Sequence, residues 1–166
     1  VGGSHYGEID VVHGFFNYQN GKIVEGEIIM DMNSIKVTDI KDAEMNAKLV
    51  GHLKSPDFFD VENHPEAVLK ITGSSSNGDY SYVLRGMLTI KGITQDIKFD
   101  AIIKPTDEGS ALVAVDLGID RTKYDITYKS KSIDALLDEF IHDVFRDIDA
   151  KKEIISVQHN QNTKIL

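Results

Sequence analysis

The sequence contains no cysteine among its 166 residues. This absence excludes disulfide bonds, thiolate nucleophiles and cysteine-ligated metal sites, but it is compatible with oxidising and reducing compartments alike. The chain also lacks an excess of basic residues, because 18 lysines and arginines stand against 27 aspartates and glutamates, for a net charge of −9. Nucleic-acid affinity comes largely from basic side chains that neutralise phosphates. We therefore expect no nucleic acid as a partner.

Long hydrophobic runs are missing as well. The longest uninterrupted apolar stretches, such as Ile28–Met30, fall far short of the roughly 20 residues of a membrane-spanning helix, so we expect no stable membrane insertion. Hydrophobic residues make up 41% and charged residues 27%, which is typical of a globular protein. The length predicts one domain, which we place at residues 1–155, followed by a polar C-terminal tail at 156–166.

Common catalytic motifs are absent too. The chain has neither a phosphate-binding glycine loop nor a Gly-x-Ser-x-Gly elbow. No two of the six histidines have the i, i+4 spacing of a zinc protease helix, although His52 and His64 flank an aromatic segment and can be brought together by a loop. Acidic pairs such as Asp57 and Asp60 arise by chance among 27 carboxylates. We predict no catalytic residue, no metal site and no cofactor.

The main positive signal is an alternation of apolar and polar side chains. Such a period of two is typical of antiparallel strands with one buried face. The segments that show it are 26–32, 80–90, 96–104 and 111–119. Dipeptides that favour tight turns lie between segments of this kind, at Asn20-Gly21, Asn77-Gly78, Lys91-Gly92 and Glu108-Gly109. The pattern predicts a β-sandwich or an up-and-down barrel.

Two regions depart from this alternation. Residues 39–64 contain acidic and polar clusters, a proline and two adjacent aromatics, and we expect short helical turns and a long connection there. Residues 132–149 place apolar side chains at i, i+3, i+4 and i+7, which by itself predicts an amphipathic helix with Ser132 as its N-cap.

Several short motifs follow one another along the chain. They are Gly3–Gly7, Asp31–Ile35, His52–Val61, His64–Ala67, Gly86–Thr94 and Asp120–Ile126. The most specific is His52–Val61, with the sequence HLKSPDFFDV. In this order, and over residues 3–148, they resemble the YceI-like family of bacterial proteins.

This resemblance implies an all-β fold, an antiparallel up-and-down barrel of eight strands that is lipocalin-like and carries short helical segments. Family members usually have a tryptophan-bearing strand ahead of the first motif, and we interpret that strand as trimmed from this chain, which would leave an open seam. The family's last strand corresponds to residues 140–149, where the periodicity predicts a helix. We expect a helical turn at 133–138 and a strand from residue 140.

The resemblance also implies a function, which is the binding of a polyisoprenoid such as a quinone or a polyprenyl phosphate in a long cavity, without chemistry. Many members are periplasmic and several are dimers, so we expect a periplasmic protein whose export signal has been removed, and a homodimer is a further hypothesis. The predicted ligand-binding residues comprise the inward-facing set, two loop aromatics and one arginine: Ile28, Met30, Met32, Phe58, Phe59, Leu69, Ile71, Tyr82, Leu84, Leu88, Phe99, Ile103, Leu117, Ile119 and Arg121.

Within this predicted site, methionine suits a wall of irregular shape, because its thioether side chain is flexible. Gly26 and Gly86 lie on the inward face, where we expect them to leave space in the lumen. Arg121 and Lys54 are the residues that we expect to meet a polar headgroup.

The residues by themselves leave other interpretations open. Alternating apolar side chains more often form a packed core than line a cavity, Phe58 and Phe59 more often anchor a loop, and an arginine is more often solvated or paired internally. With a packed core, the chain would be an interaction or stress-response module that acts through its acidic surface. An enzyme acting on a small apolar substrate would need an inward polar pair, for instance Tyr82 and Arg121, close enough to share a proton.

Overall fold

The computed structural model describes residues 5–20, 22–105, 110–128 and 155–157. Six long strands follow one another as antiparallel neighbours, and one helix and one 3-10 turn interrupt them. The strands are β1 (Gly7–Gln19), β2 (Lys22–Val37), β3 (Glu66–Gly78), β4 (Ser81–Ile90), β5 (Ile93–Pro105), β6 (Ser110–Asp116) and the short β7 (Ile155–Val157). The helix is α1 (Ala43–Lys54), and the 3-10 turn is η1 (Arg121–Tyr124).

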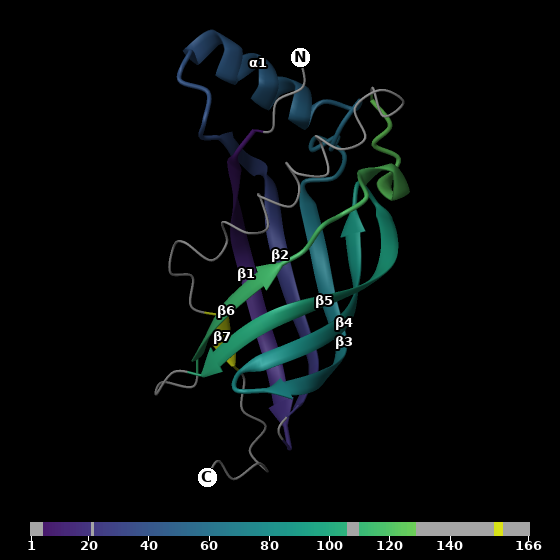
Figure 1. Ribbon diagram of the computed structural model, residues 1–166. Coiled ribbons are helices and arrows are strands. Elements are labelled where there is room, and N and C mark those ends of the chain that lie inside the picture. The colour runs from purple at the N-terminus through teal and green to yellow at the C-terminus, as the bar shows by residue number, and fades with distance from the viewer. Residues whose placement is uncertain (1–4, 21, 106–109, 129–154, 158–166) are drawn as a thin grey trace.

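The strands curl into a barrel-like sheet (Figure 1). β7 pairs antiparallel with β6 at two residues and parallel with β1 at two residues, and this completes the ring of paired strands. The mostly antiparallel, up-and-down order of β1 to β6 confirms the fold class that the alternation predicted. Seven strands lie in the described part of the chain, so the count of eight stays a prediction.

Several sequence predictions fall outside the described residues. These are the choice between helix and strand at 133–149, the start of the first motif, and the turn at Glu108-Gly109. β7 spans the predicted domain boundary at residue 155, and residues 158–166 of the predicted tail are not described. None of the helices in the described ranges is long and apolar enough to cross a membrane.

Tight turns that contain residues with positive φ join β1 to β2 and β4 to β5. Lys91 and Gly92 have φ of 51° and 74° between paired Ile90 and Ile93, which confirms the predicted turn. The turn at residue 20 is confirmed as well, because Gln19 pairs with Lys22 and the intervening Asn20 has a φ of 50°.

The turn predicted at Asn77-Gly78 was wrong. β3 continues through Gly78, which pairs with Ser81, and the chain reverses at Asp79 and Tyr80, with φ of 21° and 66°. The physical reason is an irregularity in the β3–β4 register between Ser76 and Gly78, where Gly78 adopts a φ of 96°. Glycine serves the bulge here and not the turn itself.

Helix α1 is longer than the short helical turns that we expected. Its N-cap is Asp42, whose side chain accepts a hydrogen bond from the Met45 N–H at 2.9 Å. Lys48 forms an i, i+4 ion pair with Glu44 at 2.7 Å. The helix fully buries only Leu53, so its apolar stripe is narrow and the helical period in the sequence is weak.

Candidate ligand-binding site

The predicted wall residues share the inner face of the barrel. Ile28 of β2 pairs with Leu69 of β3, which pairs with Leu88 of β4, and residues opposite one another on paired strands point to the same side. Every predicted wall residue from β2 to β5 is buried. Leu117 and Ile119 are buried too, but they follow the end of β6 and do not belong to a strand. Their contact with a ligand stays a prediction.

The expectation that Gly26 and Gly86 leave space in the lumen was wrong. A Cβ atom placed on Gly26 would lie 2.6 Å from the ring of Phe16, which is 2% exposed and fills that space. A Cβ atom on Gly86 would lie 2.3 Å from the backbone oxygen of Lys70 in β3. Gly86 therefore permits a close approach of two strands, which is a usual role of glycine inside a sheet. Phe16 was absent from the predicted wall residues, although Phe16 and Tyr18 both occupy inward positions of β1, two residues apart.

Phe58 and Phe59 are both buried at the end of the barrel that carries α1. Their ring centroids lie 5.0 Å apart in an edge-on arrangement. The segment that carries them folds back on itself, because the Phe58 N–H donates to the Ser55 carbonyl and the Phe59 N–H donates to the Leu53 carbonyl. These contacts are those of two aromatics that anchor a loop to the core.

Arg121 is the one buried charged residue in the described chain, at 2% exposure. Its Nη1 donates to the carbonyl oxygen of Ile126 at 2.8 Å, and its guanidinium carbon lies 5.7 Å from the ring centroid of Phe58. The arrangement combines a charge-assisted hydrogen bond with a cation–π contact. Arg121 thus has bonding partners within the protein, as the internally paired interpretation predicts.

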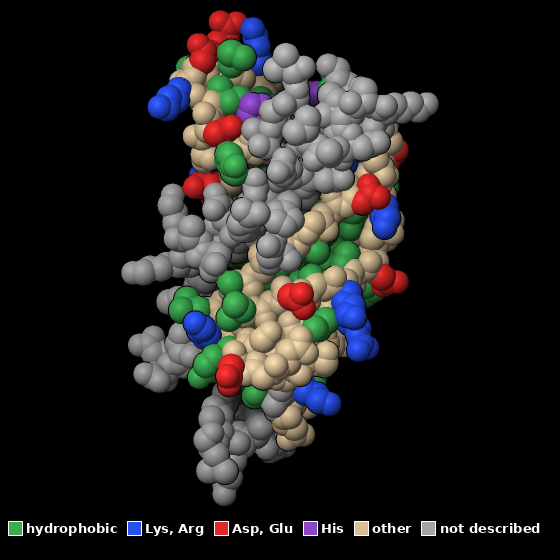
Figure 2. Space-filling view, in the orientation of Figure 1, with side chains coloured by type: hydrophobic (Ala, Val, Ile, Leu, Met, Phe, Trp, Pro, Cys, Tyr) green, Lys and Arg blue, Asp and Glu red, His purple; other side chains and the backbone are tan. Residues whose placement is uncertain are grey.

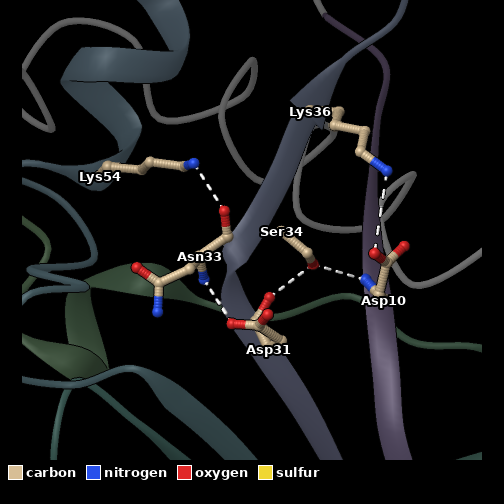
Figure 3. Close-up of polar contacts among 6 residues, drawn as sticks. All are labelled: Asp10, Asp31, Asn33, Ser34, Lys36 and Lys54. Atoms are coloured by element: carbon tan, nitrogen blue, oxygen red, sulfur yellow. Dashed lines mark hydrogen bonds and ion pairs between the residues drawn. The ribbon is translucent and has the colours of Figure 1, made fainter.

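Lys54 is also bonded within the protein. Its Nζ donates to the backbone oxygen of Asn33 at 2.6 Å, across from α1 to β2 (Figure 3). At this point β2 bulges, since Glu8 pairs with Lys36 while Asp10 pairs with Asp31. The bond from Lys54 holds the bulged strand against the helix.

The hydroxyl of Ser34 bridges the same bulge (Figure 3). It accepts from the Asp10 N–H at 2.7 Å and donates to the Asp31 carbonyl at 2.6 Å. This gives a structural reason for the Asp31–Ile35 motif. Other motifs meet at this end of the barrel too, because Lys91 donates to the backbone oxygens of Pro56 and Asp125 at 2.9 Å and 3.3 Å.

The two histidines that flank the aromatic loop have different surroundings. The ring of His52 lies 4.3 Å from that of Tyr128 and 5.8 Å from that of Phe58, and its Nε2 is buried with no hydrogen-bond partner among the described residues. His64 lies 3.9 Å from an Asp60 carboxylate oxygen and next to Gly92. Over the described ranges, no cluster of three potential metal ligands occurs.

Tyr82 lies at the other end of the barrel, near the turn between β3 and β4. Burial, followed by a hydrogen bond with the Tyr18 side chain, raises the pKa of Tyr82 to about 12. Tyr82 and Ile90 lie eight positions apart along β4, which is roughly 25 Å of strand, and η1 lies at the Ile90 end. The structure therefore does not bring Tyr82 and Arg121 together as a proton-sharing pair.

Known proteins support a family assignment. A sequence model described as the YceI-like domain matches residues 1–146. A UPF0312 protein of Pseudomonas putida strain W619 is 32% identical over 101 residues, which cover 59% of this chain and 52% of that protein. One from Pseudomonas aeruginosa strain LESB58 is 31% identical over 140 residues, which cover 76% and 71%. The chain spans about half the length of most curated relatives that it matches.

Solved structures share the fold at low sequence identity. The Campylobacter jejuni YceI protein superimposes with a TM-score of 0.55 at 16% identity, covering 81% of this chain and 75% of that one. BcnA of Burkholderia cenocepacia gives a TM-score of 0.55 at 20% identity, with coverage of 76% and 75%. The domain match over most of the sequence, together with this shared fold, confirms the resemblance that the motifs indicated, and the chain belongs to the YceI-like family.

Proposed function

We propose that this protein binds a hydrophobic isoprenoid lipid, a quinone or a polyprenyl phosphate, inside the barrel and performs no chemistry on it. The observation that carries the proposal is the buried apolar inner face that β2, β3, β4 and β5 share, with Met30 and Met32 among its members. A prenyl chain has few hydrogen-bonding groups, so its binding rests on apolar burial. Each five-carbon unit contributes roughly 3–4 kcal/mol before the cost of ordering the chain is subtracted.

Membership of the YceI-like family supports the same proposal. We extend it to a complete barrel of eight strands in the whole protein, to a periplasmic location and to self-association. Fractionation of the native host tests the location, because a protein found with the cytoplasmic fraction would contradict it. Light scattering of the purified protein tests self-association.

A packed interaction module is the second candidate, and one observation favours it. Phe16 fills the space beside Gly26, which shows that part of the interior is occupied by side chains. The outer surface then carries the function. On β5 and β6, Ile102 and Leu112 are 49% and 52% exposed, and Figure 2 shows hydrophobic side chains among charged ones over this part of the surface.

Native mass spectrometry of the full-length protein, purified from its own host, distinguishes these candidates. We expect a stoichiometric adduct that organic extraction releases and that lipid analysis identifies as an isoprenoid. A mass without any adduct, unchanged after exposure to quinones and polyprenyl phosphates, would refute the lipid-binding proposal. The packed interaction module would then be the better interpretation.

A further inference from the structure

The inner face of the barrel changes its chemistry along the axis. On the half of β3 that lies nearer α1, the inward residues are apolar. After a register irregularity next to Gly73, the inward positions are Ser74 and Ser76, which pair with the buried Leu84 and Tyr82 of β4. Paired residues on neighbouring antiparallel strands share a face, so both serines lie on the inner side of the sheet, with Ser74 half-buried and Ser76 exposed at the end of the strand. The interior is therefore apolar toward α1 and carries hydroxyl groups at the opposite end.

The pairing between β2 and β3 also ends before the hydroxyl-bearing end. The ladder runs from Asp31 and Glu66 to Gly26 and Ile71. Beyond it, the Ile23 N–H donates to the Ser74 hydroxyl oxygen at 2.8 Å, so a side chain bridges the two strands there. Because Ser74 accepts that bond with its oxygen, its own O–H remains a donor.

Tyr18 of β1 and Tyr82 of β4 supply two further hydroxyls at this end. Tyr18 pairs with the buried Ile23, and Tyr82 is itself buried opposite Ser76, so both side chains lie on the inner face. Burial, followed by a hydrogen bond with the Tyr18 side chain, raises the pKa of Tyr82 to about 12, so the Tyr82 phenol is protonated at physiological pH. A pair of hydroxyls uses one proton in its mutual bond and leaves the other as a donor. Tyr18 is 45% exposed, and the pair is therefore accessible from the mouth of the barrel.

No charged side chain of the described strands points into the hydroxyl-bearing end of the barrel. Ile23 is buried, so its neighbour Lys22 alternates to the outer face, where it is exposed. At the α1 end, Arg121, Lys54 and Lys91 already donate to backbone carbonyls. A phosphate placed at the hydroxyl-bearing end would lose its hydration without gaining a cation, which is costly. An uncharged hydrogen-bond acceptor fits the spare O–H donors of the hydroxyl-bearing end.

We infer that the ligand carries an uncharged acceptor head, such as a carbonyl or a hydroxyl, held by Tyr18 and Tyr82 beside Ser74, with its apolar tail directed toward α1. This inference rests on the proposed function and deepens it. It favours an uncharged head such as that of a quinone over the phosphate of a polyprenyl phosphate. It also places the head at the end of the barrel opposite Arg121 and Lys54, the residues that the sequence analysis expected to meet it.

The test uses delipidated full-length protein and three probes with the same branched carbon skeleton. Geranylgeraniol has an uncharged head, geranylgeranyl monophosphate has a charged head, and phytane has no head. We expect wild-type protein to bind geranylgeraniol at least about tenfold more tightly than the monophosphate. Tyr18→Phe and Tyr82→Phe each weaken geranylgeraniol binding roughly fivefold, which is the loss of one hydrogen bond, and leave phytane binding unchanged. Unchanged phytane binding also shows that the variant barrels are folded.

Tyr128→Phe is the matched control, since it removes a phenolic hydroxyl at the α1 end, beside His52. We expect it to leave the binding of all three probes unchanged. Equal or tighter binding of the monophosphate would overturn the inference. A loss of geranylgeraniol affinity in Tyr128→Phe or His52→Gln, with none in the two other tyrosine variants, would also overturn it and place the head near α1. If none of the three probes binds, the proposed function fails, and the inference fails with it.

Discussion

Replacement of glycine by alanine should change the free energy of unfolding in opposite directions at Gly86 and Gly51, because their surroundings differ. Gly86→Ala places a Cβ atom 2.3 Å from the Lys70 backbone oxygen, and the strands must separate to admit it. We expect it to lower the free energy of unfolding by about 2–3 kcal/mol. Gly51→Ala adds a methyl group to an exposed position of α1 with nothing within 4 Å, and should raise that free energy by about 0.5–1 kcal/mol. Urea denaturation followed by circular dichroism measures both, and similar changes in the two variants would refute the close strand approach.

Arg121 should stabilise the fold, because its side chain is buried and bonded within the protein. Arg121→Ala removes the bond to the Ile126 carbonyl and the contact with the Phe58 ring, and leaves a cavity and a buried acceptor. We expect a loss of about 2–4 kcal/mol in the free energy of unfolding. Lys123→Ala is the control on the same 3-10 turn. The Lys123 side chain is exposed, and the Gln95 side-chain amide donates to the Lys123 backbone oxygen, which the substitution keeps. A change within about 0.5 kcal/mol is expected there. Equal losses in the two variants would contradict a structural role for the guanidinium.

At the scale of elements, η1 gives a prediction about pH. Its N-cap is Asp120, whose pKa is lowered chiefly by the hydrogen bond from the Thr122 side chain, at 2.6 Å, and also by the Thr122 N–H and nearby cations. Because its folded pKa lies below its unfolded value, the stabilisation is present above about pH 4 and is lost as the pH falls through the folded pKa. The cost of Asp120→Ala in urea denaturation should therefore be larger at pH 6 than at pH 2.5. A cost that does not vary between these pH values would contradict the prediction.

The elements differ in how well the sequence alone predicts them. The turn at Lys91-Gly92 was predictable, because two residues with positive φ join two alternating strands. The turn near Asn77-Gly78 was not, since the same dipeptide can occupy a bulge and the choice depends on the pairing with β4. Helix α1 gave a weak periodic signal because it buries only Leu53, and its stability comes from its cap and from contacts outside the helix. Asn46, for example, donates to the backbone oxygens of Val37 and Ile40.

At the scale of the whole molecule, the alternation predicted which side chains face inward, because a period of two fixes the face of each strand. It could not predict how the interior is filled. The contact between Phe16 and Gly26 depends on the register between β1 and β2. Tyr18 and Tyr82 interact although their strands, β1 and β4, are not neighbours in the sheet. Local sequence carries no record of such contacts, so the change from an apolar to a hydroxyl-bearing interior became visible only in the structure.

The stability of the whole molecule should depend on its ligand if the barrel is hollow. A ligand that binds only the folded state at 100 times its dissociation constant stabilises that state by about 2.7 kcal/mol. For a chain of this length, the midpoint of thermal unfolding should then rise by about 5–10 °C. We expect protein as purified from its host to unfold at the higher temperature, delipidated protein at the lower one, and geranylgeraniol to restore the difference. A packed core leaves no interior site for a ligand, so equal midpoints in all three samples would support the interaction module. Because delipidation can also damage a protein, the recovery with geranylgeraniol is the decisive part of the measurement.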